Sequence, residues 1–184
     1  MTTTHYQTDL KTQKRLVLER GVKQLGLSCS DEQIDQLLTY LEMLDRWNQA
    51  YNLTAIKDPL EMIGLHLLDS LAVSPMLSGE SCIDVGTGAG LPGIPLAIMN
   101  PKKKFTLLDS NGKKTRFLFQ AKIELKLSNI QEVNTRVEKY LPEHGYDHVL
   151  SRAFSSLSDM VGYCDHLLTT GGSFLALKGR IDKT

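Results

Sequence analysis

Apolar residues recur at helical spacing through the first part of the chain. From Ser30 onward they fall at intervals of three and four residues, and Ser30 with Gln33 has the spacing of a capping box. Similar one-sided patterns cover about residues 10–25 and 59–73. We therefore predict a helical region over residues 1–77, packed on the rest of the chain. The apolar positions of its clearest helix are Ile34, Leu37, Leu38, Leu41, Leu44 and Trp47, the last of which we expect in the core.

The pattern changes after residue 77. Short apolar or β-rich runs then alternate with helical stretches, which indicates βαβ units feeding a parallel sheet. We predict an α/β fold with a Rossmann-like core over residues 78–184, within one compact domain. In chain order the segments are CIDV, 92–99, KFTLLD, 112–127, IQEVN, a short link, HVLSRAF, 156–168 and SFLALKG.

The stretch CIDVGTGAGLPG joins the first run to a glycine-rich turn and the start of a helix. Such a turn brings backbone N–H groups and a positive helix end close to a ligand. Two ligands fit it: a dinucleotide, held by its pyrophosphate, and S-adenosylmethionine. An ionised Asp84 would repel a pyrophosphate but attract the ammonium or sulfonium of S-adenosylmethionine, directly or through water, which favours the methyl donor. The turn's candidate ligand-binding glycines are Gly86, Gly88 and Gly90.

Asp109 ends the second apolar run, about nineteen residues beyond Gly90. An acid at this position accepts hydrogen bonds from ribose hydroxyls. Both candidate cofactors contain such a ribose, so Asp109 predicts a nucleoside ligand without choosing between them.

Arg152 and Phe154 lie at the predicted carboxyl end of the fourth strand, where ligands gather in open α/β sheets. A cation and an aromatic ring there indicate contact with a nucleobase or phosphate. Their positions fit a purely structural interpretation equally well, in which Arg152 pairs with a nearby acid and Phe154 packs in the core. Further cations are either RNA contacts or solvated side chains: Lys102, Lys103, Lys104, Lys113, Lys114, Arg116, Lys178 and Arg180.

Composition and charge restrict which partners the protein could bind. Twenty-one basic and twenty-one acidic residues cancel, so nucleic-acid contact must come from a local patch. Cys29, Cys82 and Cys164 lack metal-ligand spacing, and we expect them to be buried thiols in a reducing compartment, with no metal site. No apolar run approaches the roughly 20 residues of a membrane span, and no signal peptide is evident, so we expect a cytoplasmic protein without membrane contact.

His66, Asp69 and Ser70 supply the residue types of a hydrolase triad within one predicted helix. Their spacing argues against one, because Ser70 would meet the other two only by accident and no G-x-S-x-G turn exposes a nucleophile. We expect these residues to have a structural or substrate-shaping role.

The motifs together resemble those of bacterial 16S rRNA guanine-N7 methyltransferases, the RsmG family, also called glucose-inhibited division protein B (GidB). The resemblance covers most of the chain from Trp47 to Gly179. It implies a class I S-adenosylmethionine-dependent methyltransferase fold with an N-terminal helical extension, and methylation of one guanine, position 527 in the usual 16S numbering, in the small ribosomal subunit. The segments that carry it are RWNQAYNLTAI, HLLDSLAV, IDVGTGAGLPGIPLAI, FTLLDSNGKKTRFL, TRVEKY, VLSRAF and FLALKG.

The resemblance also implies cofactor contacts. Gly86 and Leu91 belong to the glycine turn, Val137 and Glu138 would lie beside the adenosine, and Arg152 is a cofactor-site residue in the family. Its position alone predicts that Arg152 contacts the substrate, whereas the resemblance favours a contact with the cofactor and leaves room for both. Family members continue past LALKG into segments ending in an antiparallel strand, so C-terminal strands are expected to be missing here, with one sheet edge uncovered.

Guanine N7 carries a lone pair and no hydrogen, so its methylation needs no general base, and catalysis consists of alignment and electrostatic stabilisation. We expect Asp84 and Asp109 to hold the donor, Arg152 to order cofactor or RNA, and Phe154 to stack near the base. Three alternatives fit the same residues. They are a methyltransferase of the same fold for a small molecule or protein, a non-catalytic rRNA-binding or ribosome-assembly factor, and, more distantly, an NAD-dependent oxidoreductase, which Asp84 opposes.

Overall fold

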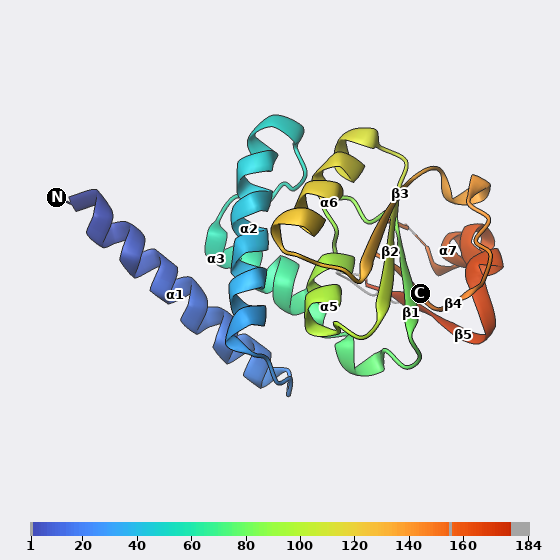
Figure 1. Cartoon of the computed structure of the whole chain (residues 1–184), viewed down its shortest axis with the longest axis horizontal. Coiled ribbons are helices and arrows are strands. Elements are labelled where there is room, and N and C mark those ends of the chain that lie inside the picture. The colour runs from blue at the N-terminus through green and yellow to red at the C-terminus, as the bar shows by residue number, and fades with distance from the viewer. Residues whose placement is uncertain (1, 155, 178–184) are drawn as a thin grey trace.

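The fold begins with a helical layer. The computed structural model describes residues 2–154 and 156–177. Figure 1 shows the first helix, α1 (Thr2–Gln24), projecting from the body and α2 (Asp31–Tyr51) lying between it and the sheet. Ser30 accepts a hydrogen bond from the Gln33 N–H at 3.2 Å, and the Gln33 side chain accepts one from the Ser30 N–H at 3.0 Å. The predicted capping box is therefore confirmed, whereas α1 begins earlier than the predicted residue 10.

The helix predicted over residues 59–73 is not a uniform α-helix. It comprises α3 (Pro59–Met62), a π-helical segment η1 (Ile63–Leu68) and α4 (Asp69–Leu71), followed by a 3₁₀ turn η2 (Ser74–Met76). A one-sided apolar pattern indicates which face is buried but does not distinguish α from π winding, because both wind the buried residues onto one side.

Within the described residues, five parallel strands form one sheet in the order β3-β2-β1-β4-β5. The predicted alternation of strands and helices is thus confirmed. The chain goes outward from β1 through β2 and β3, then returns to the other side of β1, so the strand order reverses between β1 and β4. Ligands of such sheets bind beyond the carboxyl ends of the strands at this reversal. The strands are β1 (Ser81–Val85), β2 (Lys104–Asp109), β3 (Ile130–Asn134), β4 (Tyr146–Ser151) and β5 (Leu168–Ala176).

Several boundaries differ from the predicted ones. The strand expected from residue 173 already begins at Leu168. The helix expected over 112–127 ends at Glu124, where Lys126 turns the chain with φ 55°. Lys178, Gly179 and Arg180 lie outside the described residues. The connecting helices are α5 (Gly93–Met99), α6 (Gly112–Glu124) and α7 (Leu157–Cys164), with 3₁₀ turns η3 (Val137–Lys139) and η4 (Asp165–Leu167).

The helical layer and one face of the sheet share a hydrophobic core. Figure 1 shows α5 and α6 between the sheet and α2, with α7 on the opposite face. The ring of Tyr40 in α2 lies 6.3 Å from that of Phe117 in α6, and Trp47 makes an edge-to-face contact with Phe117 at 5.6 Å. Trp47 is therefore a core residue, as predicted. The boundary predicted after residue 77 falls between η2 and β1.

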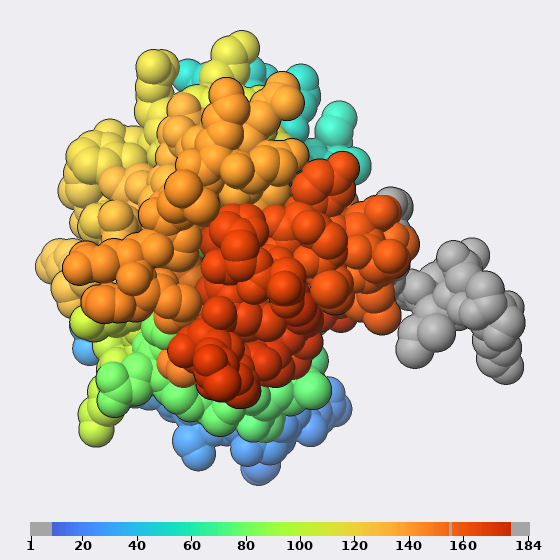
Figure 2. Space-filling model, turned by 90° about the vertical axis from the view of Figure 1, so that its right-hand side faces the viewer, coloured from blue at the N-terminus to red at the C-terminus, as the bar shows by residue number. Residues whose placement is uncertain are grey.

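A smaller core lies on the α7 side, which Figure 2 shows as a surface formed largely by the later chain in orange and red. Of the three cysteines, Cys82 and Cys164 are buried, and burial raises the pKa of their thiols to about 12 and about 11. Cys29 is only half-buried, which corrects the prediction that all three are buried. No helix in the described part of the chain is long and apolar enough to cross a membrane.

Candidate functional site

The glycine turn is fastened to the carboxyl end of β2. The N–H groups of Gly86 and Thr87 donate to the Leu108 carbonyl at 2.9 and 3.1 Å. Gly86 has φ 68°, a left-handed conformation that favours glycine, and a Cβ there would lie only 2.7 Å from the Ala153 Cβ. The turn therefore needs glycine at this position for both its backbone conformation and its contact with the end of β4.

Asp84 lies beneath the turn and is fully buried. Its Oδ2 accepts hydrogen bonds from the Thr87 hydroxyl at 2.6 Å and the Gly93 N–H at 2.9 Å, while its buried Oδ1 has no partner among the described residues. Burial raises the pKa of this carboxyl to about 6, against the opposing effect of the two hydrogen bonds and of nearby Arg152. Asp84 was expected to reach the ligand directly or through water. In this structure the carboxylate is enclosed by the turn that it supports, so its charge reaches the site from beneath the turn.

Asp109 joins the end of β2 to the same turn. Its Oδ2 accepts from the Gly88 N–H at 2.9 Å and its Oδ1 from the Asn111 N–H at 2.8 Å, and Lys114 Nζ lies 3.7 Å from Oδ2. A carboxylate has about four lone-pair positions, so these contacts leave acceptor capacity for ribose hydroxyls.

A cavity of about 410 Å³ opens beside these residues, at the carboxyl ends of the strands. It brings together five of the residues predicted for the site: Gly86, Asp109, Val137, Glu138 and Phe154. Its size falls within the usual range of small-molecule sites. The other residues that line it are Val85, Leu108, Ser110, Lys114, Thr135, Arg136 and Ala153.

The remaining predicted residues do not line this cavity. Asp84 supports the turn from below, and Gly88 donates to Asp109. Gly90 is buried against the Ile94 and Leu118 side chains, and Leu91 packs against the main core. These four residues act on the shape of the turn in this structure rather than on the cavity surface.

Arg152 contacts the helical layer. Its Nη2 lies 3.0 Å from Asp69 Oδ2, and its two terminal nitrogens donate to the Leu65 carbonyl at 3.4 and 3.3 Å. Leu65 belongs to the π-helical segment η1, and Asp69 is the first residue of α4, directly after it. Pairing with an acid is one of the roles expected for this arginine, and the structure identifies that acid as Asp69.

His66 and Ser70 do not form a hydrolase site. His66 Nε2 lies 2.8 Å from the Thr54 hydroxyl oxygen, and the Ser70 hydroxyl donates to the His66 carbonyl rather than to its ring. Burial, and then the charge of Arg152, lowers the pKa of His66. These contacts agree with the structural or substrate-shaping role expected for these residues.

The Phe154 ring stacks on Tyr163 of α7, with centroids 6.2 Å apart and an interplanar angle of 15°. Phe154 is half-buried and Tyr163 is half-exposed, so the aromatic pair connects the cavity wall to the surface.

Several residues that shape the site were missed by the sequence analysis. Tyr40 of α2 is buried, and its hydroxyl donates to the Ala89 carbonyl in the glycine turn at 2.8 Å. Thr87 and Gly93 hold Asp84. Tyr40 fits the apolar face of α2 as a core residue, and nothing local in the sequence indicates where its hydroxyl points.

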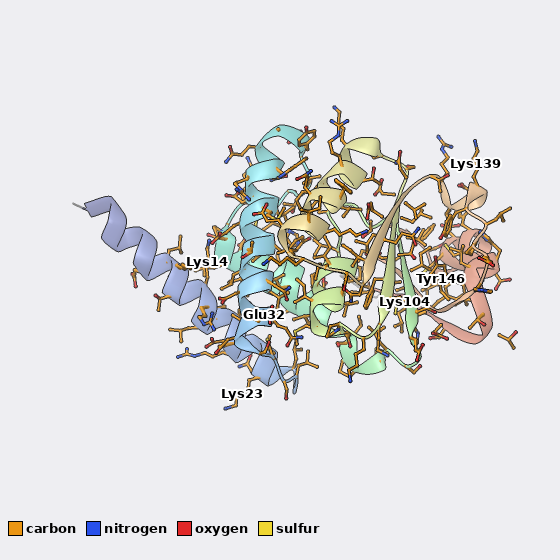
Figure 3. All side chains as sticks on the ribbon, viewed as in Figure 1. Lys14, Lys23, Glu32, Lys104, Lys139 and Tyr146 are labelled. Carbon is orange, nitrogen blue, oxygen red and sulfur yellow. The ribbon has the colours of Figure 1, made fainter. Side chains whose placement is uncertain are left out.

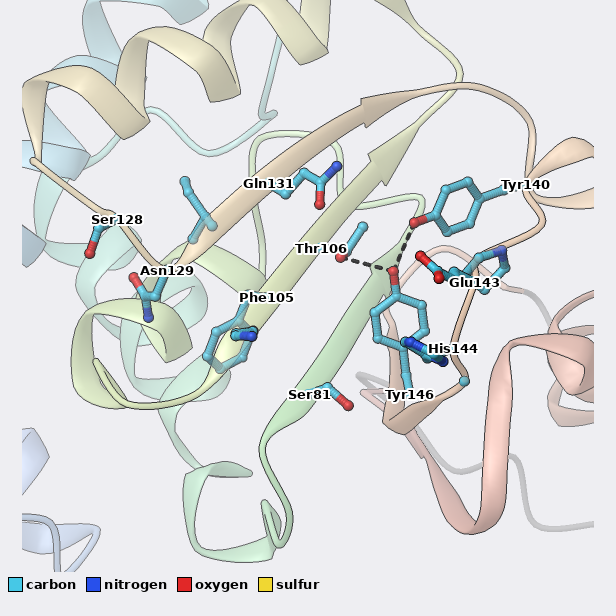
Figure 4. Close-up of a pocket in the computed structure, with 14 residues that line it drawn as sticks. Ser81, Phe105, Thr106, Ser128, Asn129, Gln131, Tyr140, Glu143, His144 and Tyr146 are labelled. Carbon is cyan, nitrogen blue, oxygen red and sulfur yellow. Dashed lines mark hydrogen bonds between the residues drawn. The ribbon is translucent and has the colours of Figure 1, made fainter.

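A second cavity, of about 480 Å³, lies at the opposite ends of the strands (Figure 4). There the Tyr146 hydroxyl donates to the Thr106 hydroxyl at 2.9 Å and lies 2.8 Å from the Tyr140 hydroxyl. Burial raises the pKa of Tyr146, so this group remains protonated. The glycine turn and both acids are absent from its lining, and we therefore take the cavity at the carboxyl ends as the candidate site.

Basic side chains lie on opposite sides of the described part of the molecule. Figure 3 shows Lys14 and Lys23 along α1 on one side and Lys139 on the other. Arg136 and Lys139 are exposed in the segment that borders the candidate cavity. Among the described residues no group of three or more His, Cys, Asp or Glu side chains is placed to hold a metal ion.

The sequence has close relatives of known family. Residues 33–184 match the family described as rRNA small subunit methyltransferase G (GidB). Relatives named ribosomal RNA small subunit methyltransferase G include one from Shewanella frigidimarina, 54% identical over 90% of this chain and 81% of the relative. Another, from Marinomonas sp., is 57% identical over 88% of this chain and 78% of the relative. A third, from Vibrio cholerae serotype O1, is 54% identical over 90% and 79%.

Solved structures share the fold at low sequence identity. An S-adenosylmethionine-dependent methyltransferase from Thiobacillus denitrificans, in complex with S-adenosyl-L-homocysteine, superposes with a TM-score of 0.53 at 14% identity, over 73% of this chain and 54% of that one. One from Methanococcus maripaludis, described as a putative methyltransferase of this type, gives 0.54 at 19% identity, over 76% and 62%. With the Rossmann-like methyltransferase fold and the sequence match agreeing, the chain belongs to the rRNA small subunit methyltransferase G family.

Proposed function

We propose that this protein transfers a methyl group from S-adenosylmethionine to N7 of a guanine in the 16S rRNA of the small ribosomal subunit. The observation that carries the proposal is the cavity that joins Gly86, Asp109, Val137 and Glu138 at the strand ends, in a chain that is 54% identical to a named small-subunit methyltransferase. Ribosomes are cytoplasmic, so this substrate also implies a cytoplasmic enzyme.

The residues present fit S-adenosylmethionine, which when bound supplies an electrophilic methyl group on a sulfonium. Asp109 retains acceptor capacity for the ribose hydroxyls, and Val137 and Glu138 line the cavity, which supports the role beside the adenosine that the family resemblance implies for them. Gly86 presents no side chain toward the cavity. Asp84 acts through its charge from beneath the turn, which favours a cationic ligand over a pyrophosphate.

The nucleophile requires no deprotonation, because N7 already has a lone pair in the plane of the base. The enzyme's contribution is then to hold the donor methyl in line with N7 and to stabilise the charge that moves onto the purine.

Recognition requires an accessible base. Unstacking a loop guanine costs only a few kcal/mol, and the Phe154–Tyr163 pair offers an aromatic surface at the cavity for it to stack on. Arg152 orders the cofactor or the RNA beside it. If Arg152→Ala left both S-adenosylmethionine affinity and turnover unchanged, this role would be wrong.

The test is transfer of labelled methyl from S-adenosylmethionine to 16S rRNA in small subunits that lack the modification, with chemical cleavage at 7-methylguanosine to map the product. We expect a single cleavage, at the guanine implied by the family resemblance. No incorporation, despite measurable binding of S-adenosylmethionine, would instead favour a non-catalytic assembly factor. Incorporation into a small molecule or protein, but not into rRNA, would favour another substrate.

A further inference from the structure

An ion pair connects the helical layer to the carboxyl end of β4. Arg152 Nη2 and Asp69 Oδ2 are 3.0 Å apart, and the side chains are 30% and 52% exposed. Ala153 and Phe154, the next two residues after Arg152, line the candidate cavity. The pair is therefore both open to a large ligand and adjacent in the chain to the cavity wall.

The π-helical winding of η1 shapes this junction. The Asp69 N–H donates to the Gly64 carbonyl, five residues back, and the Leu65 carbonyl meets the Arg152 guanidinium. Short π-helical segments are frequent at functional sites. Asp69 and the Leu65 carbonyl contact the same guanidinium, which restricts the orientations of the Asp69 and Arg152 side chains.

His66, three residues before Asp69, has a ring nitrogen without a partner in the described part of the chain. His66 is buried, with a relative exposure of 7%, and its Nδ1 makes no hydrogen bond within the described part of the chain. Its Nε2 is held by Thr54. Because burial and the charge of Arg152 both favour the neutral ring, the junction presents one cation and one anion, from Arg152 and Asp69.

These two charges match the Watson–Crick edge of guanine. That edge offers an acceptor at O6 and donors at N1 and N2, whereas adenine presents a donor at N6 and an acceptor at N1. The ion pair engages Asp69 through Oδ2, whereas a carboxylate offers about four lone-pair positions, and a guanidinium carries five N–H donors, more than its contacts with Asp69 and Leu65 use.

We propose that the Asp69–Arg152 pair binds the Watson–Crick edge of the target guanine, with Asp69 accepting from N1–H and N2–H and Arg152 donating to O6. This inference rests on the proposed function. Held by this edge, the base leaves N7, on its other side, free to meet the donor methyl. The pair would thereby select guanine over adenine, and Asp69 becomes a specificity residue contributed by the helical layer.

The test compares wild type with Asp69→Asn on small subunits reconstituted with 16S rRNA carrying guanine or inosine at the target position. Inosine lacks only the N2 amino group. Since hydrogen bonds to charged groups contribute about 1.5–3 kcal/mol, we expect inosine to lower kcat/KM of the wild type about 10- to 100-fold. Asp69→Asn should lower kcat/KM on guanine to a similar degree and largely abolish the difference between guanine and inosine. Its affinity for S-adenosylmethionine, measured by calorimetry, should stay within about twofold of wild type.

The matched control is Glu124→Gln, which breaks the exposed Arg46–Glu124 pair at 2.9 Å between α2 and α6. It should leave kcat/KM and the guanine preference unchanged, and denaturant unfolding should show both variants folded. The inference would be overturned if Asp69→Asn kept the wild-type kcat/KM and the wild-type preference for guanine over inosine. A parallel loss of S-adenosylmethionine affinity would also overturn it, because Asp69 would then act on the cofactor. Failure of the wild type itself to methylate rRNA would overturn the proposed function, and this inference with it.

Discussion

Replacing Gly86 by alanine perturbs the point where the glycine turn meets the end of β4. The new methyl group would be held by a backbone with φ 68° and would approach the Ala153 Cβ to 2.7 Å. A left-handed conformation costs a non-glycine residue roughly 1–2 kcal/mol, and overpacking costs about 1–3 kcal/mol more. We therefore expect Gly86→Ala to destabilise the protein by about 2–5 kcal/mol.

Two further variants separate these contributions. Gly26 has a similar φ of 71°, but a Cβ there would meet nothing within 4 Å, so Gly26→Ala should show only the conformational cost of roughly 1–2 kcal/mol. Combining Gly86→Ala with Ala153→Gly should recover the contact part of the loss, which a double-mutant cycle with Ala153→Gly alone measures.

The assays are urea unfolding and calorimetric binding of S-adenosylmethionine. Because Gly86 lines the cavity, we expect Gly86→Ala to weaken binding about tenfold or more, while Gly26→Ala leaves affinity unchanged. The reasoning would be refuted if Gly86→Ala were no more destabilising than Gly26→Ala, or if Ala153→Gly failed to restore any stability in the Gly86→Ala background.

Three other substitutions test the supports of the turn. Because the pKa of Asp84 is raised from 3.8 to about 6 in the folded state, the folded protein binds the extra proton, so this group's contribution to stability falls as pH rises from about 4 to about 6. Asp84→Asn should lack that fall. The difference in unfolding free energy between wild type and Asp84→Asn should change by roughly 3 kcal/mol between pH 4 and pH 7. Parallel plots of unfolding free energy against pH for the two proteins would contradict this expectation. Tyr40→Phe should cost about 1–2 kcal/mol in urea unfolding, because the Ala89 carbonyl loses its buried partner, and an unchanged midpoint would show that water replaces the hydroxyl. Asp109→Asn should weaken S-adenosylmethionine binding about tenfold while Asp45→Asn, at an exposed position of α2, does not; equal affinities would remove Asp109 from the cofactor site.

The strands and the location of the site could be predicted because their signals are local. Each strand is a short apolar run, and Gly86 and Asp109 directly follow or end such runs. Parallel strands place their carboxyl ends together, so residues far apart in sequence meet in one cavity without any pairwise signal.

Side-chain direction could not be predicted in the same way. Asp84 was assigned to the ligand, yet Thr87 and Gly93 enclose its carboxylate, and that choice depends on how the turn closes. The contact between Arg152 and the Leu65 carbonyl spans 87 positions and depends on π-helical winding, which the apolar pattern does not encode. The position of Arg152 was predicted, whereas its partner required the tertiary structure.

Methylation of small subunits reconstituted with 16S rRNA carrying 7-deazaguanine at the target position tests whether guanine N7 is the nucleophile. This base keeps the Watson–Crick edge and the ring shape of guanine but replaces N7 with a carbon that has no lone pair in the plane. We predict labelled methyl transfer from S-adenosylmethionine to the guanine-containing subunits and none to the 7-deazaguanine subunits, with equal binding of both to the enzyme. Equal transfer to both would contradict the account, because another atom would then be the nucleophile.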